Sequence, residues 1–201
     1  LYRLVGSEMC IRDRDLMELA KPDGEETVAF ARAANWVAYN LNALGRYEEA
    51  EPLFRRGLEI RELVLGPDHP DTATSYNNGA ANLNAQGQFA EAEPLYRKGL
   101  EIREMVLGPD HPDTAASYSN VAANLNAQGR YAEAQPLYRK GLAIRERVLG
   151  PDHPDTAAGY NNVAANLYAQ DRYAEAEPVY RKGLAIRERV LGPDHPDTAA
   201  G

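Results

Sequence analysis

The residues of this sequence that could do chemistry are four histidines, each held in the same short motif. His69, His111, His153 and His195 all lie in the string Gly-Pro-Asp-His-Pro-Asp-Thr, which recurs every 42 residues. Histidine beside aspartate could bind a metal ion or act as a general base. Loops of successive repeats are expected to lie ~8–10 Å or more apart, which is too far for two histidines to share one ion. The motif therefore predicts a turn and a helix cap rather than a metal site.

Other catalytic patterns are missing from the sequence. It contains no Gly-x-x-x-x-Gly-Lys-Ser/Thr, no His-Glu-x-x-His and no Cys-x-x-Cys, and Cys10 is its only cysteine. No nucleophile and base can be paired from these residues. We therefore expect no catalysis, no cofactor and no internal disulfide.

Composition excludes several classes of partner. The 201 residues are 44% hydrophobic and carry a net charge of -8, with a pI of about 5.1. An acidic chain repels phosphate backbones, so nucleic acid is not an expected partner. No apolar run approaches the ~20 residues of a membrane span, and no signal peptide is recognisable. We expect no membrane contact and, by default, a cytoplasmic protein.

The elements that position these residues follow from the 42-residue period. In the third unit Tyr118, Val121, Ala122 and Leu125 recur at i, i+3, i+4 and i+7, which predicts an amphipathic helix. Gly129 follows it and suits the left-handed residue after a last turn. The sequence predicts one helix, then a tight turn, in every unit.

A second helix is predicted from about residue 132 to 149. It carries two apolar stripes, so it is expected to pack on two sides, and Pro136 lies near its first turn, where proline is tolerated. Gly150 and Pro151 stop this helix, and Asp155 or Thr156 can cap the next one. The expected fold is all-α, a right-handed solenoid of stacked antiparallel helix pairs.

Glycine recurs inside the second helix of every unit. Gly57, Gly99, Gly141 and Gly183 occupy equivalent places, although glycine in a helix interior costs about 0.5–1 kcal/mol relative to alanine. Either two helices approach closely there, or duplication has copied one ancestral unit. We favour close packing.

The repeated sequence resembles a known family. Asn-Asn-Val-Ala-Ala-Asn-Leu, Gln-Gly-Arg-Tyr-Ala-Glu-Ala and Pro-Leu-Tyr-Arg-Lys-Gly-Leu-Ala-Ile-Arg-Glu-Arg-Val-Leu-Gly-Pro-Asp-His-Pro-Asp-Thr are similar to the 42-residue tetratricopeptide repeats of kinesin light chains. The ordinary repeat has 34 residues. The resemblance implies a protein–protein interaction module in which the first helices line a concave face.

On that reading the concave face is neutral and rich in amides. Residues 72–87, 114–129 and 156–170 contain no charged side chain. Asparagine is unfavourable inside helices, so its repetition there indicates a purpose. Its amide could pair with an extended peptide, or these amides could bond between helices or to solvent. The candidate lining residues are Asn77, Asn78, Asn84, Ser119, Asn120, Asn126, Asn161, Asn162 and Tyr168.

The same face lacks the cations of chaperone-binding relatives. Those proteins hold a C-terminal carboxylate with lysine and arginine on first helices, and Arg32 is the only such candidate here. We do not expect a carboxylate clamp.

The chain divides into a lead-in and repeats. Residues 1–14 match no repeat and resemble translated sequencing-adapter read-through, the alternative being a genuine helix that leads into 15–24. The repeats are predicted at 25–65, a degenerate unit with Trp36 in the place of Asn78, and at 66–107, 108–149 and 150–191. Residues 192–201 begin a fifth unit, so we expect a fragment of a longer protein and self-association through its C-terminal end.

Two functions remain open at this stage. The first is an adaptor whose groove binds an extended peptide of a partner protein. The second is a structural or sensor tail of a larger signalling protein, such as a signalling ATPase. An enzyme ranks third.

Overall fold

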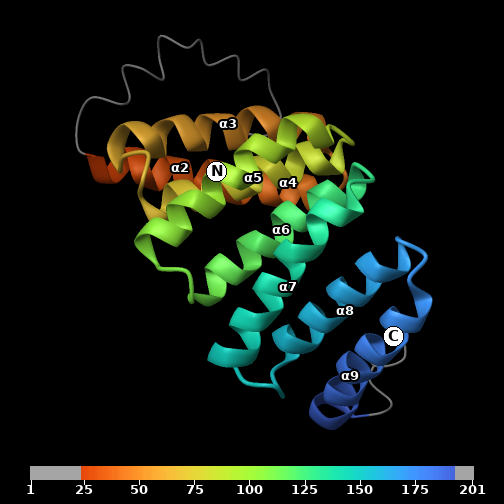
Figure 1. The fold of residues 1–201 in the computed structure, drawn as a ribbon. Coiled ribbons are helices and arrows are strands. Elements are labelled where there is room, and N and C mark those ends of the chain that lie inside the picture. The colour runs from red at the N-terminus through yellow and green to blue at the C-terminus, as the bar shows by residue number, and fades with distance from the viewer. Residues whose placement is uncertain (1–23, 193–201) are drawn as a thin grey trace.

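A computed structural model describes residues 24–192 of the chain. This part contains eight helices and no strand (Figure 1). The helices are α2 (Gly24–Ala43), α3 (Tyr47–Val64), α4 (Pro70–Ala85), α5 (Phe89–Val106), α6 (Pro112–Ala127), α7 (Tyr131–Val148), α8 (Pro154–Tyr168) and α9 (Tyr173–Leu191).

The helices form four hairpins stacked in chain order. Each first helix packs on the second helix of its own pair, and each second helix packs on the first helix of the next pair. The first helices α2, α4, α6 and α8 also approach one another from pair to pair. They therefore lie on the inner side of the stack, and the predicted solenoid of antiparallel helix pairs is confirmed (Figure 1).

The cap of the first helices differs from the prediction. Neither Asp155 nor Thr156 caps α8, because the N-cap is His153, whose Nδ1 accepts a hydrogen bond from the Asp155 backbone N–H at 3.1 Å. His69 and His111 cap α4 and α6 in the same way. Thr156 instead donates its hydroxyl proton to the Gly150 carbonyl at 2.8 Å, which closes the preceding loop.

The turn within each hairpin has the expected left-handed residue. Gly129 has φ 74°, and the fourth hairpin holds Asp171 at φ 59° in the equivalent place. Its carboxylate accepts a hydrogen bond from the Tyr173 hydroxyl at 2.6 Å. That bond offsets part of the cost of a side chain in this conformation. Pro136 lies inside α7 without ending it.

The recurrent helix glycine marks a close approach. A Cβ placed on Gly141 would lie 3.0 Å from the Ala115 carbonyl oxygen and 3.1 Å from the Ser119 hydroxyl. Gly99 and Gly183 are equally crowded, whereas Gly57 has 3.5 Å of space to the Ala31 carbonyl. The packing explanation is therefore correct for the last three of these glycines.

Repeat boundaries remain a prediction. Residues 1–14, nearly all of the lead-in 15–24 and nearly all of the predicted fifth unit 192–201 lie outside the described residues.

Candidate functional site

A ladder of buried asparagines joins the first helices. Asn124 is fully buried, and its Nδ2 donates to Asn84 Oδ1 at 2.9 Å and to the Phe89 carbonyl at 2.9 Å. Asn82 and Asn166 are also fully buried and donate to the preceding repeat in the same pattern. The ladder links each first helix to both helices of the pair before it.

Two predicted site residues belong to this ladder. Asn84 accepts from Asn124, and Asn126 accepts from Asn166 at 2.7 Å. Both are half-buried on the inner side. Their side-chain oxygens accept hydrogen bonds from the next repeat, so these amides bond between helices, which was one of the alternatives to peptide binding. Their amide N–H groups are the part that a ligand could use.

Two further predicted residues are buried against second helices. Asn77 is 7% exposed and its Nδ2 donates to the Ala73 carbonyl at 3.1 Å. Ser119 is also 7% exposed, and its hydroxyl accepts from the Arg145 guanidinium at 3.0 Å. These side chains support the first helices from behind.

Three of the predicted amides form one row. Asn78, Asn120 and Asn162 are half-buried and occupy equivalent places on α4, α6 and α8. Asn78 donates to Asn35 at 3.4 Å and Asn120 to Asn77 at 3.5 Å, both long for a hydrogen bond. Such weak bonds exchange readily for a ligand. Exposed alanines lie one turn further along each helix, at Ala81, Ala123 and Ala165.

The first repeat contributes aromatic side chains that the sequence prediction did not include. Trp36 and Tyr39 are each 66% exposed and stand 42 residues before Asn78 and Ala81. They therefore extend the same row onto α2. The signal is present in the sequence as Trp36 in place of asparagine, a change that degeneration of the repeat would also explain. Exposed aromatic residues are typical of protein interfaces.

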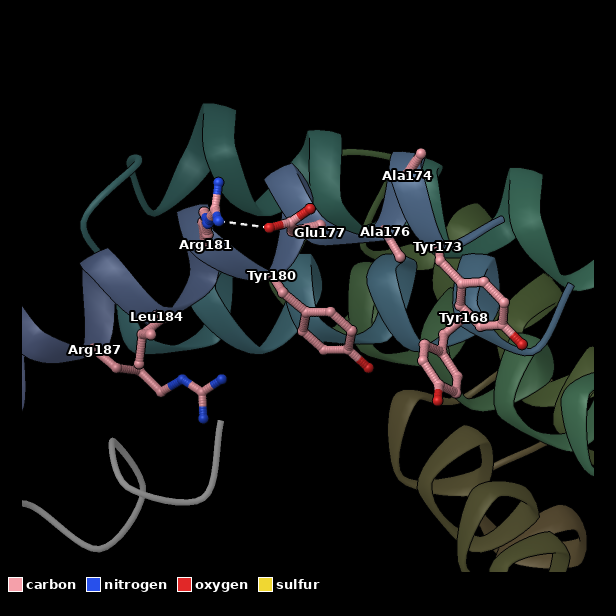
Figure 2. A pocket seen from close by; sticks show the side chains of 9 residues that line it. All are labelled: Tyr168, Tyr173, Ala174, Ala176, Glu177, Tyr180, Arg181, Leu184 and Arg187. Atoms are coloured by element: carbon pink, nitrogen blue, oxygen red, sulfur yellow. Dashed lines mark hydrogen bonds and ion pairs between the residues drawn. The ribbon is translucent and has the colours of Figure 1, made fainter. Parts of the chain in front are cut away.

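The fourth pair adds an aromatic residue at another repeat position, because Tyr168 stands in the place of Asn84 and Asn126. Tyr168 is 59% exposed, and its ring lies 4.8 Å from that of Tyr173 in an edge-to-face arrangement. Both rings border a cavity of about 480 Å³ along α9 (Figure 2). Asn161 lies two turns before Tyr168 on α8, where its buried Oδ1 has no hydrogen-bond partner and would lie 2.6 Å from a Cβ placed on Gly183.

An arginine of a second helix brings positive charge close to the first helices α4 and α6. The Arg103 guanidinium donates to Ser117 at 2.8 Å and to Thr74 at 3.4 Å, and thus lies between two first helices. Burial lowers the pKa of Arg103, and the nearby Asp113 carboxylate partly opposes that shift. Arg32 lies 3.8 Å from Asp71 and is largely exposed. The inner row itself carries no charge between Thr72 and Gly87.

Among the described residues, no group of three or more His, Cys, Asp or Glu is placed to hold a metal ion. No helix in this part of the chain is long and apolar enough to cross a membrane.

Comparison with known proteins decides the family. The profile of the tetratricopeptide repeat matches residues 30–105, 75–147, 113–188 and 155–200. The chain belongs to the tetratricopeptide repeat family. No curated protein matches it at a significant level.

Solved structures share this repeat fold. A Podosopora anserina protein of nearly identical TPR-like repeats, described as a kinesin light chain, is 27% identical with a TM-score of 0.75 over 84% of this chain and 80% of its own. BtubC (BKLC) from P. vanneervenii is 23% identical, with a TM-score of 0.76 over 91% and 71%. Aspartyl phosphate phosphatase F from Bacillus subtilis is 16% identical, with a TM-score of 0.72 over 89% and 45%. The predicted resemblance to kinesin light chain repeats is confirmed, and this repeat fold is typical of protein–protein interaction scaffolds.

Proposed function

We propose that this tetratricopeptide array is a scaffold whose inner face binds an extended peptide segment of a partner protein. The observation that supports this most directly is the uncharged, accessible row along α4, α6 and α8. Asn78, Asn120 and Asn162 each present an amide, which can both donate to and accept from a peptide backbone. The alanines beside them leave space for the peptide to approach.

The nine predicted residues divide into two groups in this proposal. Asn78, Asn120, Asn162 and Tyr168 contact the peptide, because Asn78 and Asn120 make only long side-chain hydrogen bonds, Asn162 occupies the equivalent place and Tyr168 is exposed. The other five hold the first helices in register or support those amides from behind, and they are Asn77, Asn84, Ser119, Asn126 and Asn161.

The expected affinity is moderate. Each neutral amide bond contributes about 0.5–1.5 kcal/mol, and ordering a flexible peptide offsets part of the sum. We expect a dissociation constant of around one micromolar, which corresponds to a binding free energy of about -8 kcal/mol. Because the row carries no charge, affinity should depend only weakly on salt.

The test uses a peptide selected from a random library against the whole chain. We expect replacement of Asn78, Asn120 and Asn162 together by alanine to abolish binding in a titration at two salt concentrations. Helicity should be unchanged, because alanine is the better helix former. The matched control is Arg139→Glu on the outer surface of α7, which should bind normally. Binding that survives in the asparagine variant and disappears in the Arg139 variant would place the site on the convex face.

We also propose that the C-terminal end takes part in self-association. The half-buried Val179 and the exposed Val190 of α9 are among the apolar residues at that end.

A further inference from the structure

Inside the array, each second helix is covered by the next first helix through a repeated set of contacts. Between α7 and the following hairpin, Asn166 donates to the Tyr131 carbonyl at 3.0 Å and Arg172 donates to Gln135 at 3.0 Å. Leu142 is 9% exposed because α8 lies over it. The contacts thus consist of a hydrogen bond from an amide to a backbone carbonyl, a hydrogen bond from a guanidinium to a polar side chain, and apolar packing.

The outer side of α9 presents the acceptor half of this set. Tyr173 stands in the place of Tyr131, Glu177 in that of Gln135, and Leu184 in that of Leu142. Leu184 is only half-buried, and the Glu177 side chain is 60% exposed. With the Tyr168 ring they line the cavity seen in Figure 2. We call this surface the C-terminal face.

The outer side of α2 presents the donor half. Asn40 is equivalent to Asn82, and it donates to the Trp36 carbonyl of its own helix at 2.7 Å. Arg46 is equivalent to Arg130, which bonds both Glu133 and a glutamate of the preceding repeat, and Arg46 makes the first of these bonds, to Glu49 at 2.7 Å. The N-terminal face comprises Phe30, Ala33, Val37 and Asn40 of α2, with Leu44 and Arg46 of the turn that follows it.

The two faces also depart from the repeat in matching ways. Leu44, which is 71% exposed, replaces the glutamine found at Gln86 and Gln128. Tyr168 replaces the asparagine that accepts the ladder bond in earlier repeats, such as Asn126. Inside the array both positions bond the same ladder asparagine, as Gln128 and Asn84 do with Asn124. One of these two polar positions has thus become apolar at one end of the array, and the other has become aromatic at the other end.

We infer that the N-terminal face of one copy packs on the C-terminal face of a second copy, head to tail. Asn40 then donates to the partner copy's Tyr173 carbonyl, Arg46 meets Glu177, and Leu44 packs beside Tyr168. Pairing two C-terminal faces would instead set acceptor against acceptor. A head-to-tail contact is heterologous and leaves one free face of each kind on an open assembly, so assemblies lengthen with concentration unless they close into a ring. This inference does not depend on the proposed peptide groove.

The experiment uses two variants of the whole chain, each with one face disabled. Leu44→Asp places a charge in the N-terminal face, and Leu184→Asp does so in the C-terminal face. We measure mass by sedimentation velocity over a concentration series. The unmodified chain should form species larger than dimers. Each variant alone should be monomeric, with at least about ten-fold weaker association, as expected when a central interface residue is lost. An equimolar mixture should give a heterodimer and nothing larger. The Leu44→Asp variant keeps an intact C-terminal face and the Leu184→Asp variant an intact N-terminal face, so only one contact can form.

Control variants keep the result interpretable. Met105→Asp changes an exposed apolar residue in the middle of the array and should assemble normally. Glu177→Lys disables the C-terminal face at an exposed position, in case Leu184→Asp fails to fold, and Arg46→Glu in the partner copy should restore its assembly.

The proposal is wrong if the unmodified chain stays monomeric, or if Leu44→Asp still dimerises, which would indicate paired C-terminal faces. It is also wrong if Leu44→Asp lowers the melting temperature without changing the mass, because the α2 face is then covered from within its own chain.

Discussion

At Gly141 the backbone of α7 comes so close to α6 that an added methyl group would press on the neighbouring helix. The Ala115 carbonyl would lie 3.0 Å from the new Cβ, and backbone cannot move aside as a flexible side chain can. Gly57 occupies the equivalent place in α3 with 3.5 Å of space. The same substitution should therefore have opposite effects at these two positions.

We predict that Gly141→Ala destabilises the protein and Gly57→Ala stabilises it. Overpacking costs ~1–3 kcal/mol, which exceeds the ~0.5–1 kcal/mol that alanine gains over glycine in a helix. Thermal unfolding followed by circular dichroism measures both. If both variants gain stability, the recurrent glycine reflects duplication alone.

Side-chain burial was the part of the site that sequence could not predict. Asn77 and Asn78 are adjacent and identical in type, yet Asn77 is buried against the second helix and Asn78 lies on the inner row. That difference depends on the rotation of α4 about its axis, which packing between repeats sets. The histidine caps were missed for a related reason, since aspartate and threonine are the commoner caps and stood next to them in the sequence.

At the scale of the element, the period predicted the pairing of the helices and the turn between them, but not the caps of the first helices. The predicted second helix at about 132–149 is α7 at Tyr131–Val148, and the predicted turn at Gly129 is left-handed. The ladder through Asn124 could not be foreseen, because its partners lie 40 and 35 residues earlier in the chain. Helix periodicity shows on which face of its own helix a residue lies, but it does not show which residues of a neighbouring helix that residue contacts.

We predict that Asn124→Ala lowers the free energy of unfolding by about 2–3 kcal/mol, because it removes three hydrogen bonds of ordinary length at a fully buried site. The matched control is Asn120→Ala on the same helix, whose only side-chain hydrogen bond within residues 24–192 is 3.5 Å long. That variant should change stability by less than about 0.5 kcal/mol. Urea denaturation of both variants gives the comparison. Equal losses would mean that the accessible row is structural, and would count against the proposed peptide site.

At the scale of the whole molecule, each hairpin contacts only the hairpins beside it. Packing is confined to consecutive helices and to successive first helices among the described residues. Stability in such an array is a sum of repeat terms and neighbour terms. The largest core cluster runs from Ala80 to Ala176, whereas the first pair has a separate small cluster around Phe54. The middle of the array should therefore be its most stable part.

This distribution predicts a gradient of amide hydrogen exchange along the chain. Backbone amides of α5, α6 and α7 should exchange slowest, because helices on both sides cover them, and those of α2 and α9 should exchange faster. Measurements at low protein concentration avoid assembly, which would protect the end helices. Gly141→Ala supplies the perturbation: exchange should accelerate most in α6 and α7, less in α4 and α9, and least in α2. Uniform acceleration in all eight helices would show instead that the array unfolds as one cooperative unit, with coupling that extends well beyond neighbouring repeats.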